Sequence, residues 1–208
     1  PITIAAAFAQ NLRSALQKHL KGALSTSGAT FVRFVYAAPL AALYVAGLVL
    51  AGYPLPTPGA EFVLYALAGG VCQILATALL VYLFAFRNFA VGTTYSKTET
   101  IQTAILGIVI LGETISSSAV FGILISLVGV MAMSLASSDI SVRNLLGGLV
   151  QRTALIGIAS GSFFGLSAVS YRAASLSLGG EGFVMQAAFT LSFVTIFQSA
   201  IMAVYMRC

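Results

Sequence analysis

The sequence predicts an all-α integral membrane protein, a polytopic helix bundle with about seven transmembrane helices. Of its 208 residues, 59% are hydrophobic and only 7% are charged, and the mean hydropathy is +1.02. A soluble domain carries roughly a quarter charged residues, so this chain cannot cover a water-facing surface. Long apolar stretches recur from end to end, as in polytopic membrane proteins. A membrane β-barrel would show short alternating segments instead.

Charge and cysteine content exclude several other classes of protein. The net charge of +5 comes from ten Lys and Arg against five acids, and the cations are scattered near segment ends. There they set topology or bind the lipid bilayer, so we expect no nucleic acid partner. Cys72 and Cys208 offer no disulfide framework, and His19 alone cannot build a metal site, so we expect no metal and no cofactor.

The ends of the chain indicate a fragment. Residues 1–8 lack the charged lead and the cleavage motif of a signal peptide. The chain starts without Met in apolar sequence and ends directly after an apolar segment. We therefore expect that both ends have been clipped.

Seven membrane segments can be drawn along the chain, with boundaries good to a few residues. They are expected at residues 2–20, 29–52, 61–86, 88–111, 117–136, 154–178 and 182–206. Three prolines in the turn at 53–59 end the second segment, because proline cannot continue a helix. The longest polar stretch, 137–153, divides the chain into two unequal parts.

Polar residues in the first two segments allow two interpretations. The second half of segment one contains Asn11, Arg13 and Gln17. These residues either belong to a helix end that reaches the headgroups, or they line a cavity. Arg33 lies one turn inside segment two, a position that favours a headgroup anchor over a site residue.

The third and sixth segments carry packing signals. Gln73 and Thr77 are four residues apart, so they share a helix face and are expected to bond to neighbouring helices. Gly157, Gly161 and Gly165 form a stripe that lets another helix approach closely. This stripe is not a phosphate-binding loop, because no strand or lysine accompanies it.

The fourth segment carries the strongest functional signal. Lys97, Glu99 and Gln102 stand together at its start, and ionisable residues in a membrane helix mark a substrate or ion pathway by default. Lys97 and Glu99 are two residues apart in one predicted helix, so we expect them about 200° apart, on two separate polar stripes. Glu99 could bind a cation or a proton, and Lys97 could bind a carboxylate. The alternative is a purely structural ion pair with Arg13, Arg33 or Arg172.

At this segment the chain resembles the EamA-type family of the drug/metabolite transporter superfamily. The resemblance rests on the run ILGIVILGE, residues 105–113, whose LGE triplet is Leu111, Gly112 and Glu113. It also rests on FAQN, residues 8–11, and on Arg33-Phe34. It implies a ten-helix transporter with inverted repeats. Residues 1–136 would form the first repeat, 137–153 a connecting loop and 154–208 the truncated beginning of the second. The family commonly has a proline in the middle of segment four, where this chain has SKTETIQ, residues 96–102.

The resemblance implies a secondary transporter, an exporter of small metabolites such as amino acids or drug-like compounds, in the inner or plasma membrane. It would transport a small-molecule substrate by alternating access. For its assembly, the hypothesis is a homodimer. The candidate substrate-binding residues are Asn11, Arg13, Gln17, Lys97, Glu99 and Gln102.

Two other functions were weighed. A membrane-embedded enzyme is disfavoured because the chain has no HExxH, no GxSxG and a single histidine. The alternative kept beside transport is a non-transporting membrane scaffold or lipid-handling protein. A scaffold has no use for two polar stripes in a central helix.

The orientation in the membrane stays open. Lys and Arg gather at the odd-numbered connections, at Lys18, Lys21, Arg87, Arg143 and Arg152. The positive-inside rule would place these connections in the cytoplasm and the amino end outside. The family resemblance implies a cytoplasmic amino end.

Overall fold

A computed structural model describes residues 2–20, 22–86, 95–112, 114, 116–136, 152–180 and 182–207, and all regular structure in this part of the chain is α-helical. The helices are α1 (Ile2–Leu20), α2 (Thr26–Val35), α3 (Ala37–Leu50), α4 (Ala60–Leu83), α6 (Glu99–Leu111), α7 (Ser117–Ala136), α9 (Arg152–Ser177) and α10 (Phe183–Arg207). The predicted all-α class is confirmed. Five of the seven predicted segments coincide with single helices within a few residues, segment 29–52 is divided between two helices, and the fourth is described only from residue 95.

The surface and the interior have the polarity of a membrane protein. Within the described residues, four stretches are long and apolar enough to cross a bilayer: α2 with α3, α4, α9 and α10. The outward faces carry large apolar side chains, such as Leu50, Ile125 and Val204. The buried set includes many polar side chains, among them Thr77, Ser160, Ser167 and Gln198. The chain is therefore a multi-pass membrane protein whose polar groups face inward.

The predicted segment 29–52 is two helices. Ser25 caps α2, and its Oγ accepts a hydrogen bond from Gly28 N at 3.1 Å. Tyr36 separates α2 from α3, and Pro39 lies in the first turn of α3. Proline fits a first helical turn, where its missing N–H leaves no bond unmade. Within one straight helix the same proline would remove a backbone hydrogen bond, so its place fits the division at Tyr36.

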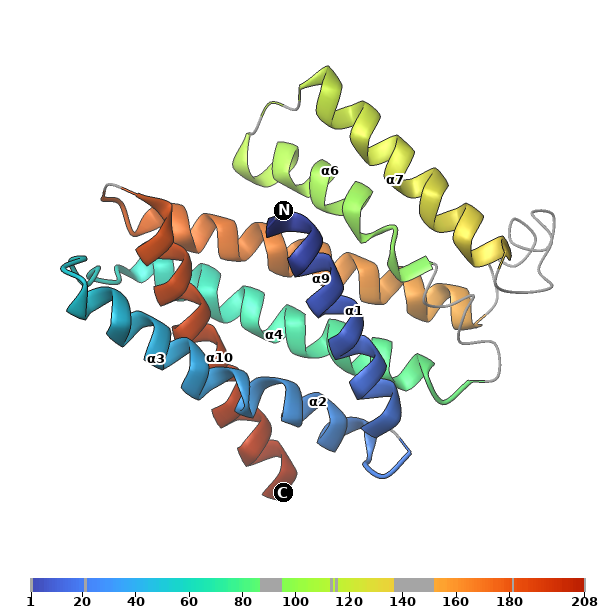
Figure 1. Cartoon of the computed structure of the whole chain (residues 1–208), viewed down its shortest axis with the longest axis horizontal. Helices are drawn as coiled ribbons and strands as arrows, with labels where there is room; N and C mark the ends of the chain where they lie inside the picture. Colours follow the sequence, from blue (N-terminus) through green and yellow to red (C-terminus); the bar gives the residue numbers. More distant parts are fainter. Residues whose placement is uncertain are drawn as a thin grey trace.

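The helices α4 and α9 form the centre of the bundle and run side by side along most of their lengths (Figure 1). Glycines allow this close packing. A Cβ at Gly69 would lie 2.7 Å from the Tyr171 ring of α9, and on the face towards α10 a Cβ at Gly70 would lie 2.9 Å from the Phe197 ring. Ser160 Oγ also donates to Ala76 O at 2.9 Å, which ties α9 to the α4 backbone.

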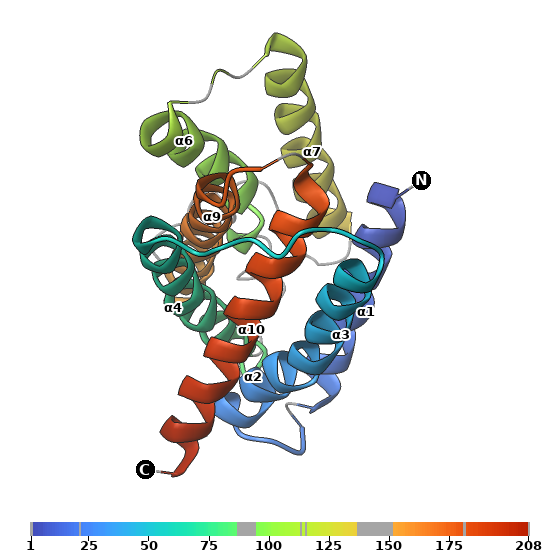
Figure 2. The ribbon, with the colours of Figure 1, turned by 90° about the vertical axis from the view of Figure 1, so that its left-hand side faces the viewer.

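The remaining helices surround this pair. α10 crosses α4 and also contacts α2 and α3, as Figures 1 and 2 show. Phe62 of α4 packs against Phe189 and Phe193 of α10, with ring centroids 5.5 and 5.2 Å apart. α6 lies on the other side of α9, and α7 follows it at the edge of the bundle (Figure 2). α4 and α9 thus lie between α10 and α6.

Candidate functional site

The helix α6 starts later than its sequence predicts. Tyr95 and Ser96 are helical, Lys97 and Thr98 form a turn, and α6 begins at Glu99. Thr98 Oγ1 donates to Tyr95 O at 2.7 Å and accepts a hydrogen bond from Gln102 Nε2 at 2.8 Å. The placement of Lys97 and Glu99 on opposite stripes of one helix is therefore wrong, because the helix is interrupted between them.

The glycine stripe of α9 seats this interrupted segment. A Cβ at Gly161 would lie 2.9 Å from Ser96 O and 3.2 Å from Glu99 N. A Cβ at Gly165 would lie 3.1 Å from Thr103 N. The predicted close approach is confirmed, and its partner is the backbone of residues 96–103.

A cavity of about 250 Å³ opens beside this contact, and we call it the central cavity. Five parts of the chain line it: α1, α2, α4, residues 96–99 and α9. The lining residues are Arg13, Arg33, Gln73, Leu80, Ser96, Lys97, Glu99, Phe164, Ser167, Ala168 and Tyr171. Three of the six predicted site residues, Arg13, Lys97 and Glu99, are among them.

Arg33 belongs to this cavity and not to the headgroup layer, so the headgroup interpretation is wrong. Its Nη1 donates to Thr77 Oγ1 at 2.6 Å. Its Cζ lies 5.5 Å from the centroid of the Phe34 ring and 5.6 Å from that of Phe164, within cation–π range. Two aromatic rings and a hydroxyl thus hold the guanidinium inside the bundle.

The charges of the cavity act on one another. The Glu99 carboxylate is attracted electrostatically by Lys97, Arg33 and Arg13. Arg13 and Arg33 repel each other. The Nε of Arg13 is buried and has no hydrogen-bond partner. The site thus contains both an uncompensated donor and a cluster of like charges.

The other predicted site residues have different places. Gln17 is only 4% exposed, both polar atoms of its amide lack partners, and it lines an adjacent groove with Arg13 and Tyr36. Gln102 Nε2 donates to Thr98 Oγ1 and lies near Gly161, and Gln102 is not among the described residues that line the central cavity. Asn11 belongs to α1, but its side chain lies outside the described part of the chain, as does Glu113.

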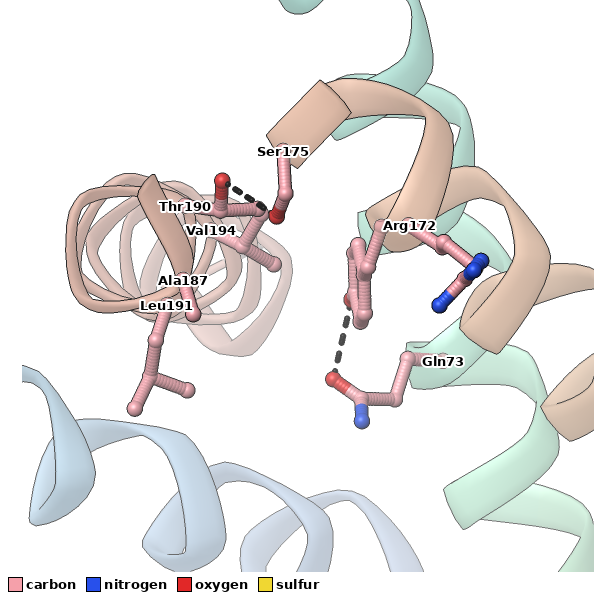
Figure 3. Close-up of a pocket in the computed structure, with 8 residues that line it drawn as sticks. Gln73, Arg172, Ser175, Ala187, Thr190, Leu191 and Val194 are labelled. Atoms are coloured by element: carbon pink, nitrogen blue, oxygen red, sulfur yellow. Dashed lines mark hydrogen bonds between the residues drawn. The ribbon is translucent and has the colours of Figure 1, made fainter. Parts of the chain in front are cut away.

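A second cavity of about 440 Å³ lies between α4, α9 and α10, and we call it the lateral cavity. Figure 3 shows Ser175 and Thr190 meeting at one side and Gln73 pointing in from α4. Ser175 Oγ donates to Thr190 Oγ1 at 3.0 Å. Arg172, which the sequence offered as an ion-pair partner for Glu99, lines this cavity instead.

Gln73 and Tyr171 line both cavities. Tyr171 Oη donates to Gln73 Oε1 at 2.9 Å, so a hydrogen bond between α9 and α4 lies where the two cavities adjoin. The prediction that Gln73 and Thr77 bond to neighbouring helices is confirmed. The spacing of Gln73 and Thr77 in the sequence indicated this role, whereas nothing in the sequence marked Ser167 and Tyr171 as residues that line a cavity.

Comparison with known proteins gives one match. The family model described as the EamA-like transporter family matches residues 2–135, which includes α1 to α6 and nearly all of α7. No curated protein and no solved structure matches the chain.

Proposed function

Because the chain belongs to the EamA-like transporter family, and so is a membrane transporter of the drug/metabolite transporter superfamily, we propose that it is a secondary transporter working by alternating access. Its substrates would be small metabolites such as amino acids or drug-like compounds, exported across the inner or plasma membrane. The central cavity carries this proposal.

Charged side chains inside a membrane bundle are energetically costly, so their presence favours a functional site. Burying an ion costs several kcal/mol even after relaxation. Arg13, Lys97 and Glu99 converge on one cavity from two separate parts of the chain. A purely structural ion cluster would use its donors internally, yet Arg13 Nε has no partner. This arrangement favours a binding site over a structural ion cluster.

The shared border of the two cavities supports alternating access. A substrate that passes from the central to the lateral cavity must pass Gln73 and Tyr171, which line both. One neutral hydrogen bond between them contributes only about 0.5–1.5 kcal/mol. We propose that Tyr171 is an internal gate, and that rocking of α9 against α4 opens it.

The test is ligand binding by variants of the central cavity. Thermal stability of the purified protein is measured with amino acids, nucleosides, sugars and cationic drugs, and active compounds are followed by tracer flux in proteoliposomes. We expect Lys97→Ala and Glu99→Gln each to change the affinity for the active compound at least about tenfold, in either direction, since each removes a charge from the cavity.

The matched control is Glu61→Gln, which removes a carboxylate from the first turn of α4, outside the central cavity. It should leave affinity and flux unchanged. If Lys97→Ala and Glu99→Gln bind and transport every compound as the parent does, the central cavity is not the substrate site. A scaffold function would be favoured if the parent itself bound and transported none of the compounds.

A further inference from the structure

The described residues that line the central cavity carry an unbalanced charge. Arg13, Arg33 and Lys97 provide three positive charges and Glu99 provides one negative charge, which leaves a net charge of +2. Arg13, Arg33 and Glu99 are partly buried, so water screens this excess less than it would on a fully exposed surface, and the excess is costly. A ligand that supplies negative charge would remove this cost.

Glu61 is the other acid among the described residues, and it does not line the central cavity. Glu61 lies in the first turn of α4, in the lining of another cavity. Glu113, Asp139 and Glu181 lie outside the described residues, and in sequence they fall between helices. Among the described residues, Glu99 is therefore the one acid that lines the central cavity.

The two arginines have unused capacity for an acceptor. Arg33 is held by the hydroxyl of Thr77 and by aromatic rings, none of which carries a negative charge. Arg13 Nε is buried without any partner. Arginines bind carboxylate and phosphate groups through paired N–H donors, and an oxyanion between two of them would also cancel their mutual repulsion.

We infer that the ligand of the central cavity is a small soluble anion, a metabolite with a carboxylate or phosphate group held between Arg13 and Arg33. This inference rests on the proposed function and names the class of its substrate. Lys97 adds attraction for the anion, and Glu99 limits the excess of positive charge in the empty cavity. The cavity volume of about 250 Å³ lies below the usual range of roughly 300–1,000 Å³ for ligand pockets, which favours a small metabolite over a lipid.

The test measures direct binding to the protein in phosphatidylcholine nanodiscs. Succinate, glutamate and inorganic phosphate are compared with glucose and putrescine by thermal shift and by radioligand binding. We expect at least one of the three anions to bind. Arg33→Gln and Lys97→Gln should weaken binding of that anion at least about tenfold, and Glu99→Gln should strengthen it at least about tenfold, since it removes a repulsive charge.

Controls separate charge from folding. Arg207→Gln removes an exposed arginine at the end of α10 and should bind as the parent does. Arg33→Lys keeps the positive charge, so it should retain more binding than Arg33→Gln. Lys97 is exposed in the turn before α6, so Lys97→Gln tests the charge even if the Arg33 variants fail to fold.

Different results would overturn the anionic class of the ligand and the proposed function. Binding of glucose or putrescine that depends on Lys97 and Glu99 would leave the site standing and overturn the anionic class. The inference also fails if an anion binds equally to all variants, or if phosphatidylglycerol nanodiscs replace the soluble anions as the stabilising ligand. If no compound of any class responds to the cavity variants, the proposed function itself fails.

Discussion

At the scale of single residues, Gln198 shows how the bundle treats its polar groups. This side chain is fully buried, and its Nε2 lies 3.0 Å from Gly70 O, 2.9 Å from Gln73 Oε1 and 3.1 Å from Tyr171 Oη. The Tyr171 hydroxyl donates onward to Gln73. Three helices thus share one polar junction within an apolar environment. Such a junction aligns the helices, but each of its hydrogen bonds contributes only modestly to stability and can be exchanged for another hydrogen bond.

The hydroxyl of Tyr171 provides a test of this junction. Tyr171→Phe keeps the ring that packs on Gly69 and removes the donor to Gln73, so unfolding free energy should fall by about 0.5–1.5 kcal/mol. If the hydroxyl gates passage, flux should change more in kcat than in KM. Thermal unfolding and proteoliposome flux measure the two effects. Tyr205→Phe, at an exposed position near the end of α10, should change neither. Wild-type stability and flux in Tyr171→Phe would refute both roles of the hydroxyl.

At the scale of elements, the contact between α9 and residues 96–103 decides the shape of the central cavity. Its glycines face backbone atoms, which cannot move aside as the end of a flexible side chain can. A Cβ at Gly161 would press on Ser96 O and on the first residue of α6. Moving this segment would also move Lys97 and Glu99, which flank the point of contact. Packing and binding are thus coupled through one glycine.

A methyl group at Gly161 should therefore damage both stability and ligand binding. We expect Gly161→Ala to lower unfolding free energy by about 1–3 kcal/mol, the usual cost of overpacking, and to weaken binding in the central cavity. The control is Gly122→Ala on α7, where a Cβ would meet nothing within 4 Å and should be neutral or stabilising. Thermal unfolding and ligand titration of both variants test the idea. Equal stability and equal ligand affinity of the two variants would show that the close contact between α9 and residues 96–103 does not contribute to stability or binding.

The same elements show which features a sequence can reveal. Helices were predictable because apolar runs must pair their backbone groups internally, and the glycine stripe was predictable from its spacing alone. The turn at Lys97 and Thr98 was not, because no Gly or Pro marks it and Thr98 makes it through its own hydroxyl. Yet it falls within residues 96–102, where the resemblance to the family led us to expect a proline. Arg33 was misassigned since its partners, Thr77 and Phe164, are distant in sequence.

At the scale of the whole molecule, the described bundle has a basic end and an opposite end with little positive charge. The 20–26 connection, the end of α4 and the start of α9 lie at one end in Figure 1, and the 51–59 and 178–182 connections lie at the other. The contacts of Arg152 show that the start of α9 lies beside the end of α4. Its Nη2 donates to Tyr82 Oη at 3.5 Å, and its Cζ lies 6.0 Å from the centroid of the Phe86 ring. The first end carries Lys18 and Arg152, whereas residues 51–59 contain no Lys or Arg.

This asymmetry predicts the orientation in the membrane. Short connections rich in Lys and Arg stay in the cytoplasm, so the 51–59 connection should face outward. Single cysteines at Thr57 and Ala23, both exposed, report the two ends in a background with Cys72 and Cys208 replaced by alanine. In intact cells a membrane-impermeant maleimide should label Thr57→Cys at once, and Ala23→Cys only after permeabilisation. The reverse pattern would mean that the charges of these connections do not set the topology and that the amino end is cytoplasmic. Equal labelling of both positions would contradict a single orientation altogether.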